Sequence, residues 1–309
     1  MAGTVTIGAS GTYASITGTG GLFEAINNNG IDGNLIAEIL DASIAETGAT
    51  ALNPMQTGCS PSYSLTIRPA TGVTTVVSGS STTPLIDLNG ADFVIIDGSN
   101  SGSSSKDMTI RNTGTGATIR LIGGAVNDTL RNCIIESQNT ATTSGTVFFS
   151  TATGTGVTTG NSNNVINNCD IRDRSDIAGV PANAVYSEGT NSLPNAGNKI
   201  SGCNVFNFTN TGVLISATGA GDGWVINPSS FYQTAARTTN ITFISILGGN
   251  GHSIVNNSIG GSAPNAGGSF FSSTARIIGI NLNVGSTTTT SIQGNTIKNM
   301  RTTGTENNM

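Results

Sequence analysis

The sequence predicts an all-β chain folded as a solenoid of stacked coils, and three observations lead to this fold class. A short phrase recurs along the chain, apolar and polar residues alternate within each copy, and the composition is rich in Gly and poor in charge. Internal repetition at spacings of tens of residues is the signature of solenoids, in which each repeat contacts only its neighbours. Such a stack presents ladders of side chains, which suit extended polymers, surfaces and self-assembly better than small molecules.

The repeated phrase consists of an apolar residue, a short Asn/Gly-rich turn and a polar/apolar alternation. One position in it, called here the slot, holds Cys or Asn in every clear copy. The long interval between the third and fourth copies hides a degenerate copy, GWVINPSSF (223–231), which we expect to place Pro228 in the slot. The clear copies are NDTLRNCII (127–135), NNVINNCDI (163–171), NKISGCNV (198–205), HSIVNNSI (252–259) and TSIQGNTI (290–297), with slot residues Cys133, Cys169, Cys203, Asn257 and Asn295.

A second type of strand recurs between the copies, so we expect at least two strands in each coil. Both types alternate with period two, which is typical of half-buried strands, and no helical period is sustained. The second type is found at 117–124, 146–154, 184–190, 212–219, 242–249 and 277–285. In the earlier part of the chain we expect strands at 34–40, 64–69, 74–79, 84–90, 92–98 and 108–112.

The composition fits stacked strands. The chain has 42 Gly and only 9% charged residues. Stacking brings like side chains of neighbouring coils to within about 5 Å, where Asn, Thr, Ser or Val are tolerated but like charges repel. Gly and Asn also adopt the left-handed backbone that tight corners require.

We expect a single elongated domain over residues 1–309, because no linker or change of composition divides the chain. Residues 1–33 form an N-terminal cap in this prediction, with Leu22, Phe23 and Ile26 at helical spacing before an Asn/Gly stop. Coils follow at about 34–300. No helix or apolar cover is expected after them, which indicates either a fragment of a longer protein or an end that stacks on another molecule.

Several partners are disfavoured by the charge and hydropathy pattern. The start of the chain lacks the basic and apolar regions of a signal peptide, and no segment approaches the roughly 20 apolar residues of a membrane span. The net charge is −5 and the 12 Lys and Arg residues are scattered. This pattern argues against nucleic acid as a partner, since its binding needs clustered cations.

The cysteines are predicted to be free. Cys133, Cys169 and Cys203 occupy equivalent slots and should stack as a buried ladder, a geometry that is poor for disulfides. Cys59 is expected to be unpaired as well. The chain has no CxxC motif and its only histidine, His252, lies at a turn of the repeat, so a metal site is not predicted.

Three stretches carry a likeness to a known superfamily: PLIDLNGADFVIIDG (84–98), GWVINPSSFYQTAARTTN (223–240) and HSIVNNSIGGSAPNAGG (252–268). The chain resembles the right-handed parallel β-helix repeat proteins, which include pectate lyases, polygalacturonases and many adhesins. It is most similar to β-helix modules of large secreted bacterial surface proteins. The resemblance implies a right-handed parallel β-helix and a secreted or cell-surface location, and it says little about activity.

The best candidate for a catalytic cluster is CDIRDRSD, which contains Asp170, Arg172, Asp173, Arg174 and Asp176. Lyases of the resembled superfamily combine acidic Ca²⁺ ligands with a Lys or Arg base, so this set is a candidate site for Ca²⁺ or for a uronate carboxylate. The alternative is a solvated corner where the charges offset one another. Polygalacturonase motifs are not matched, because only GHS at 251–253 is present and no Asp-Asp pair exists.

A candidate binding site is formed by Trp224 beside Asp222, where an exposed indole would stack on a sugar ring. Three functions remain open. The favoured one is a non-catalytic structural or adhesive module of a secreted surface protein, with an extracellular glycan as a possible partner. The others are a filament subunit that stacks head to tail on itself, and a polysaccharide lyase or glycoside hydrolase acting on an extended glycan.

Overall fold

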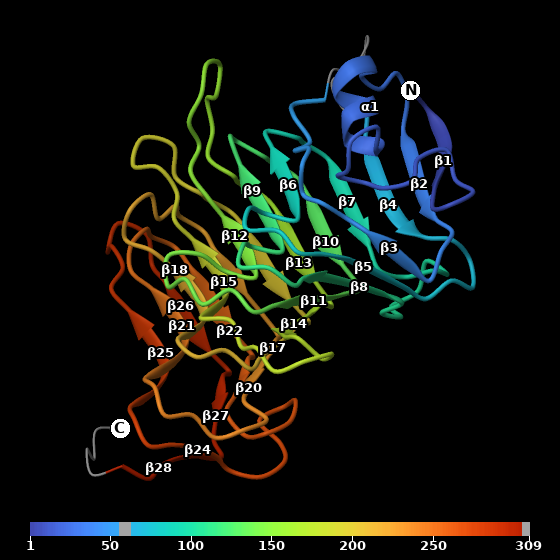
Figure 1. Ribbon diagram of the computed structural model, residues 1–309. Helices are drawn as coiled ribbons and strands as arrows, with labels where there is room; N and C mark the ends of the chain where they lie inside the picture. Colours follow the sequence, from blue (N-terminus) through green and yellow to red (C-terminus); the bar gives the residue numbers. More distant parts are fainter. Residues whose placement is uncertain (56–62, 305–309) are drawn as a thin grey trace.

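Strands recur in a fixed order along the chain, and each pairs in parallel with the equivalent strand of the adjacent coil. The computed structural model describes residues 1–55 and 63–304 and shows a parallel β-helix with three long sheets (Figure 1). The coils stack from the N-terminal end to the C-terminal end in chain order. The fold class predicted from the sequence is confirmed.

The three sheets are the three faces of the coil. Sheet 1 contains β1 (Gly3–Ile7), β2 (Leu35–Ile39), β4 (Leu65–Pro69), β7 (Val94–Asp97), β10 (Thr129–Arg131), β13 (Val165–Asn167), β16 (Lys199–Ser201), β19 (Val225–Ile226), β22 (Ser253–Val255) and β26 (Ser291–Gln293). Sheet 2 contains β3 (Ser43–Ala45), β5 (Thr75–Gly79), β8 (Met108–Asn112), β11 (Cys133–Ser137), β14 (Asp170–Asp173), β17 (Asn204–Phe206), β20 (Ser230–Tyr232), β23 (Ser258–Ile259) and β27 (Thr296–Ile297). Sheet 3 contains β6 (Ile86–Asn89), β9 (Ile119–Ile122), β12 (Val147–Phe149), β15 (Asn183–Ser187), β18 (Thr211–Ile215), β21 (Ile241–Ile246) and β25 (Ile277–Leu282).

The repeated phrase spans the corner between sheets 1 and 2. Its first half is a strand of sheet 1, its second half is a strand of sheet 2, and a residue with left-handed backbone separates them. That residue is Asn132, Asn168 or Asn256, with φ of 57°, 50° and 57°, or a Gly in the same place. A full coil therefore has three strands, one more than the minimum expected from the sequence.

The register corrects one expectation about the slot. Asn204 pairs with Ser230, so the residue opposite Cys203 is Ser229 and not Pro228. Pro228 lies opposite Gly202, at the exposed corner, where its carbonyl accepts the Gly202 N–H at 2.7 Å. Proline fits there because this position uses the carbonyl and not the N–H that proline lacks.

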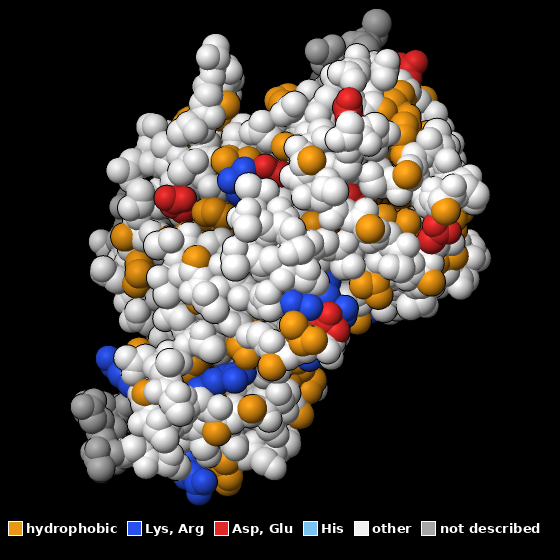
Figure 2. Space-filling view, viewed as in Figure 1, with side chains coloured by type: hydrophobic (Ala, Val, Ile, Leu, Met, Phe, Trp, Pro, Cys, Tyr) orange, Lys and Arg blue, Asp and Glu red, His pale blue; other side chains and the backbone are white. Residues whose placement is uncertain are grey.

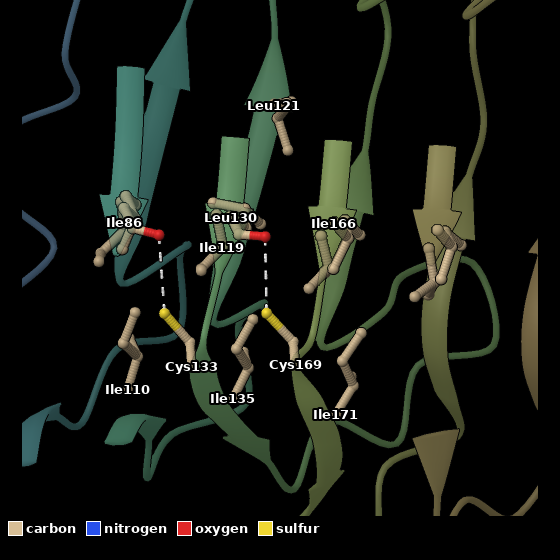
Figure 3. Packing of buried hydrophobic residues seen from close by; sticks show 14 of the residues in the cluster. Ile86, Ile110, Ile119, Leu121, Leu130, Cys133, Ile135, Ile166, Cys169 and Ile171 are labelled. Atoms are coloured by element: carbon tan, nitrogen blue, oxygen red, sulfur yellow. Dashed lines mark hydrogen bonds between the residues drawn. The ribbon is translucent and has the colours of Figure 1, made fainter. Parts of the chain in front are cut away.

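The interior is filled by columns of like side chains, one residue per coil. Leu130 and Ile166 continue a column of sheet 1, while Ile135 and Ile171 continue one of sheet 2, and all are at most 2% exposed (Figure 3). Inward and outward residues alternate along each strand, as the period-two pattern predicts. Burial of each large side chain contributes on the order of 1.5–3 kcal/mol.

The N-terminal helix α1 (Leu22–Asn29) buries the three apolar residues that its spacing predicted, Leu22, Phe23 and Ile26. It ends at Gly30, whose φ is 65°. Figure 1 shows α1 beside the first strands of the stack. At the other end, β28 (Met300–Thr302) pairs with β24 (Phe271–Ser273) in a separate small sheet.

Ile166→Asp should destabilise the protein by at least about 4 kcal/mol, because it places a carboxylate in the packed interior. Ile166 is 1% exposed, whereas Thr158 lies on an exposed loop between strands. Thr158→Asp is therefore the matched control and should change the free energy of unfolding by less than about 0.5 kcal/mol. Melting temperatures measured by circular dichroism decide this, and equal values for the two variants would refute the assignment of inward and outward residues.

Candidate functional site

The outward face of sheet 2 carries a row of charged and aromatic side chains across five coils, and Arg172 is the one member of the predicted cluster that belongs to it. Its members are aligned by the strand register and are called here the sheet 2 row. They are Arg111 in β8, Glu136 in β11, Arg172 in β14, Phe206 in β17 and Tyr232 in β20. Cross-strand neighbours in such a row touch directly, so the charges and aromatic rings act on one another.

Glu136 is the centre of the charged half of the row. Its side chain is 2% exposed, and Arg111 Nε donates a hydrogen bond to Glu136 Oε2 at 2.6 Å. Arg172 Nε lies 4.0 Å from the other carboxylate oxygen. A carboxylate this buried is retained only when cations and hydrogen bonds compensate its desolvation. Glu136 was not singled out in the sequence, because only the register between coils brings it between two arginines.

The aromatic half of the row continues from Arg172. The Arg172 guanidinium carbon lies 4.9 Å from the centre of the Phe206 ring. Phe206 and Tyr232 stack with ring centres 4.6 Å apart and planes inclined by 10°. Both rings are almost fully buried, and burial raises the pKa of Tyr232. They are therefore structural contacts of the row and not an open platform.

The other members of the predicted cluster are also engaged. Asp170 accepts a hydrogen bond from Lys106 Nζ at 2.6 Å, and Asp173 lies 3.2 Å from Arg172 Nη2. Beyond β14, Arg174 Nη2 lies 2.8 Å from Asp176 Oδ2, and this hydrogen bond lowers the pKa of Asp176 to about 2. Figure 2 shows basic and acidic side chains gathered where β11 and β14 lie in Figure 1.

The sugar-stacking prediction for Trp224 is wrong. Trp224 is 0% exposed, its Nε1 donates to the Asn195 carbonyl at 2.7 Å, and its ring packs edge-on against Phe149. Asp222 is exposed, and its Oδ1 accepts the Asn250 N–H at 2.7 Å. The indole fills the interior where its N–H also finds an acceptor, so it presents no face to a ligand.

Trp224 stands in a column at the corner that precedes sheet 1, which is called here the corner ladder. Apart from Trp224, whose indole only donates, side chains of this column accept the backbone N–H of the equivalent residue one coil earlier. Asp128 N–H donates to Asn164 Oδ1 at 2.8 Å, Asn164 N–H to Asn198 Oδ1 at 2.9 Å, and Trp224 N–H to His252 Nδ1 at 3.3 Å. His252 is 1% exposed and burial lowers its pKa, so it serves here as a neutral acceptor.

The slot residues form a second ladder of the same kind. Cys169 N–H lies 3.5 Å from Cys203 Sγ, and the Ser229 and Asn257 N–H groups each donate to the Asn one coil on, at 3.0 and 2.9 Å. The acceptor in the last of these bonds is Asn295 Oδ1. Cys133, Cys169 and Cys203 are free and buried. Burial raises the pKa of the Cys169 and Cys203 thiols, and Cys59 lies outside the described residues.

Comparisons with known proteins leave the function open. No family model matches the chain, and no curated protein matches it. Among solved structures, ORF18 of Geobacillus virus E2 aligns with a TM-score of 0.37 and 13% identity over 89% of this chain and 55% of that chain. This chain therefore spans about half the length of that protein.

Within the described residues, no group of three or more His, Cys, Asp or Glu side chains is arranged to hold a metal ion. Among the described residues, no helix is long and apolar enough to cross a bilayer.

Asp128→Asn should stabilise the protein at neutral pH by about 1 kcal/mol, because Asn fits the corner ladder and carries no ionisation cost. Asp128 is buried, its Oδ2 has no partner among the described residues, and burial raises its pKa well above the usual 3.8. Folding is therefore coupled to protonation of Asp128. The contribution of Asp128 to the free energy of unfolding is fully present below about pH 4, near the unfolded pKa, and is lost as the pH rises through the raised folded pKa. Melting curves from pH 4 to pH 8 should show the advantage of the variant growing with pH; an advantage that is constant or shrinks would contradict this reading.

Glu136→Gln should destabilise the protein by about 3 kcal/mol, because it leaves two arginines facing an uncharged group in a buried row. Glu38→Gln is the matched control, since Glu38 pairs with Arg68 at 2.8 Å on a more exposed part of the molecule. An exposed pair is worth at most about 1 kcal/mol. Urea unfolding measures the free energy of unfolding of both variants. Similar decreases for the two would contradict the prediction and show that the row is solvated.

Proposed function

We propose that the protein is a non-catalytic structural and adhesive β-helix module of a secreted or cell-surface protein, which holds loops at fixed intervals on a rigid rod. The observation that carries this proposal is the pairing of the charged cluster. Glu136, Asp170, Asp173 and Asp176 each lie within 3.2 Å of a cationic side chain. A general acid or base must be free to exchange a proton with substrate, and an acid needs a pKa near the working pH.

The solenoid itself supports a scaffold role. Side chains from the next coil satisfy corner N–H groups, and aliphatic columns fill the interior, so loops between strands are held by a regular framework. Stacked repeats offer extended surfaces that suit long partners. The likeness to β-helix modules of the pectate-lyase-like superfamily supports an extracellular location for such a rod.

A lyase or hydrolase is the enzyme alternative. Its machinery would be Asp170 and Arg172, which share the outward face of β14, with Ca²⁺ as a possible cofactor. Their pairing with Lys106 and Glu136 disfavours this reading, because substrate or Ca²⁺ would first have to displace a cation from a carboxylate.

Self-assembly remains a second candidate function, because charge is distributed unevenly along the axis. The early coils are acidic, and the residues before the first basic side chain, Arg68, include Glu24, Asp32, Glu38, Asp41 and Glu46. The late coils are basic, and between Asp222 and the next acidic residue, Glu306, lie Arg237, Arg276, Lys298 and Arg301. Opposite charges at the two ends of a rod favour head-to-tail contact between copies.

Incubation of the purified chain with polygalacturonate, alginate and xylan, with and without Ca²⁺, tests the non-catalytic role. We expect no new reducing ends and no unsaturated products. The control for an apparent activity is the pair Asp170→Asn and Arg172→Gln. Turnover that both variants abolish would overturn the proposal in favour of the enzyme alternative. Particle length that grows with protein concentration and shrinks with added salt, followed by light scattering, would instead favour the filament.

A further inference from the structure

The outward face of sheet 3 repeats the pattern of the sheet 2 row with one difference. Asp87 in β6, Arg120 in β9, Phe148 in β12 and Tyr186 in β15 are aligned by the register, so an ion pair is again followed by an aromatic pair. In sheet 2 both rings are buried. In sheet 3, Phe148 is only half-buried, and it lines a cavity.

The cavity has a volume of about 250 Å³ and lies where three consecutive loops enter sheet 3. Arg120 and Phe148 line it from the sheet, and Thr82, Thr115 and Ala141 line it from the loops before β6, β9 and β12. Figure 2 shows basic, acidic and apolar side chains side by side over the region of these strands. Pockets for drug-sized ligands are typically about 300–1,000 Å³, so this one suits a single ring.

The charge at the cavity favours an uncharged, hydroxyl-rich ligand, because Arg120, which lines it, is neutralised by Asp87 behind it. Arg120 donates to both carboxylate oxygens of Asp87, through Nε at 2.9 Å and Nη2 at 2.7 Å. The pair is neutral as a unit, and no second cation lines the cavity in the described part of the chain. Arg120 lines the cavity and its side chain keeps 27% exposure, so a guanidinium donor remains within reach of hydroxyl groups, while Asp87 lies outside the lining.

The remaining walls are fixed before any ligand arrives. Asn139 Nδ2 donates to Ser144 Oγ at 3.0 Å, and the Ala141 N–H donates to Asn139 Oδ1 at 2.9 Å, which ties the loop before β12 to itself. The Phe148 ring packs against Tyr186 with ring centres 5.5 Å apart, which fixes the orientation of Phe148. A preorganised apolar ring beside a few polar groups is the usual composition of a small-ligand site.

We propose that this cavity binds one uncharged sugar unit of a glycan, with the C–H face of the sugar on Phe148 and its hydroxyls on Arg120, whose charge Asp87 neutralises from outside the cavity. The inference rests on the adhesive part of the proposed function and gives it a location and a ligand class. It replaces Trp224 and Asp222 as the binding site.

The test is binding of the whole chain to a printed array of neutral and acidic oligosaccharides, followed by calorimetric titration of the strongest neutral hit. Ala141→Trp should weaken binding at least tenfold, because Ala141 is exposed at the mouth and a large side chain there fills the cavity. Thr143→Trp is the matched control on the same loop, outside the cavity lining, and should bind like the wild type. Phe148→Ala should also weaken binding at least tenfold, and Phe206→Ala, its counterpart in sheet 2, should not.

Circular dichroism melts of all four variants separate a lost site from a lost fold, and the two loop variants keep the test valid if an aromatic variant unfolds. Binding to acidic oligosaccharides alone, no binding to any neutral one, or unchanged binding by Ala141→Trp would overturn the proposal. Cleavage of a bound oligosaccharide would overturn the non-catalytic function instead, and would leave the cavity as the binding site if Ala141→Trp still blocked it.

Discussion

Backbone N–H groups at the corners of the coil are the constraint on which the rest of this structure depends. Within the sheets, each N–H finds a carbonyl on the next coil, but at a corner the chain turns out of the ladder and the N–H loses that partner. Here a side chain one coil on supplies the acceptor: Asn164 and Asn198 in the corner ladder, Ser229 and Asn257 in the slot. The same side chains therefore help to position the coils that they join.

The fixed register that follows from these ladders also creates the surface chemistry. Residues far apart in the chain, such as Arg111 and Arg172, become neighbours of one carboxylate because each is outward-facing at the same level of its coil. Two faces show the same sequence of an ion pair followed by an aromatic pair. On sheet 2 the row is closed and structural, whereas on sheet 3 the loops leave a cavity over Phe148. The loops, and not the strands, thus distinguish a stable face from a binding face.

The sequence was sufficient to predict the solenoid, the helix over Leu22–Asn29 and nearly all strands of the coils, because these depend on local periodicity and repetition. It was not sufficient to divide the repeated phrase into separate strands of sheets 1 and 2. It also placed the slot at Pro228 instead of Ser229, because the copy at 223–231 lacks the Cys or Asn that marks the slot in the clear copies. Trp224 was a candidate for sugar stacking because it stands beside Asp222, but its exposure depends on the position of the corner ladder in the coil, which puts it inside.

The residues around the sheet 3 cavity were even harder to bring together from the sequence. Asp87, Arg120 and Phe148 are separated by variable loops, so counting along the sequence does not bring them into one row. A signal was present in principle: each is the outward residue of an alternating strand, and aligning those strands coil by coil would have placed them together. The cluster at Asp170–Asp176 was predicted as a site because its charges are adjacent in sequence. In the structure, these charges pair with cationic or acidic neighbours.

Amide hydrogen exchange of the corner residues tests the central claim most directly. If the ladders satisfy the corner N–H groups, the amides of Asp128, Asn164 and Ser229 should exchange as slowly as those of the adjoining strands. The variant Asn198→Ala removes the acceptor of the Asn164 N–H, so it should selectively speed exchange at Asn164. Fast exchange at these corners in the wild-type protein, at the rate of the exposed loop around Thr158, would contradict the account.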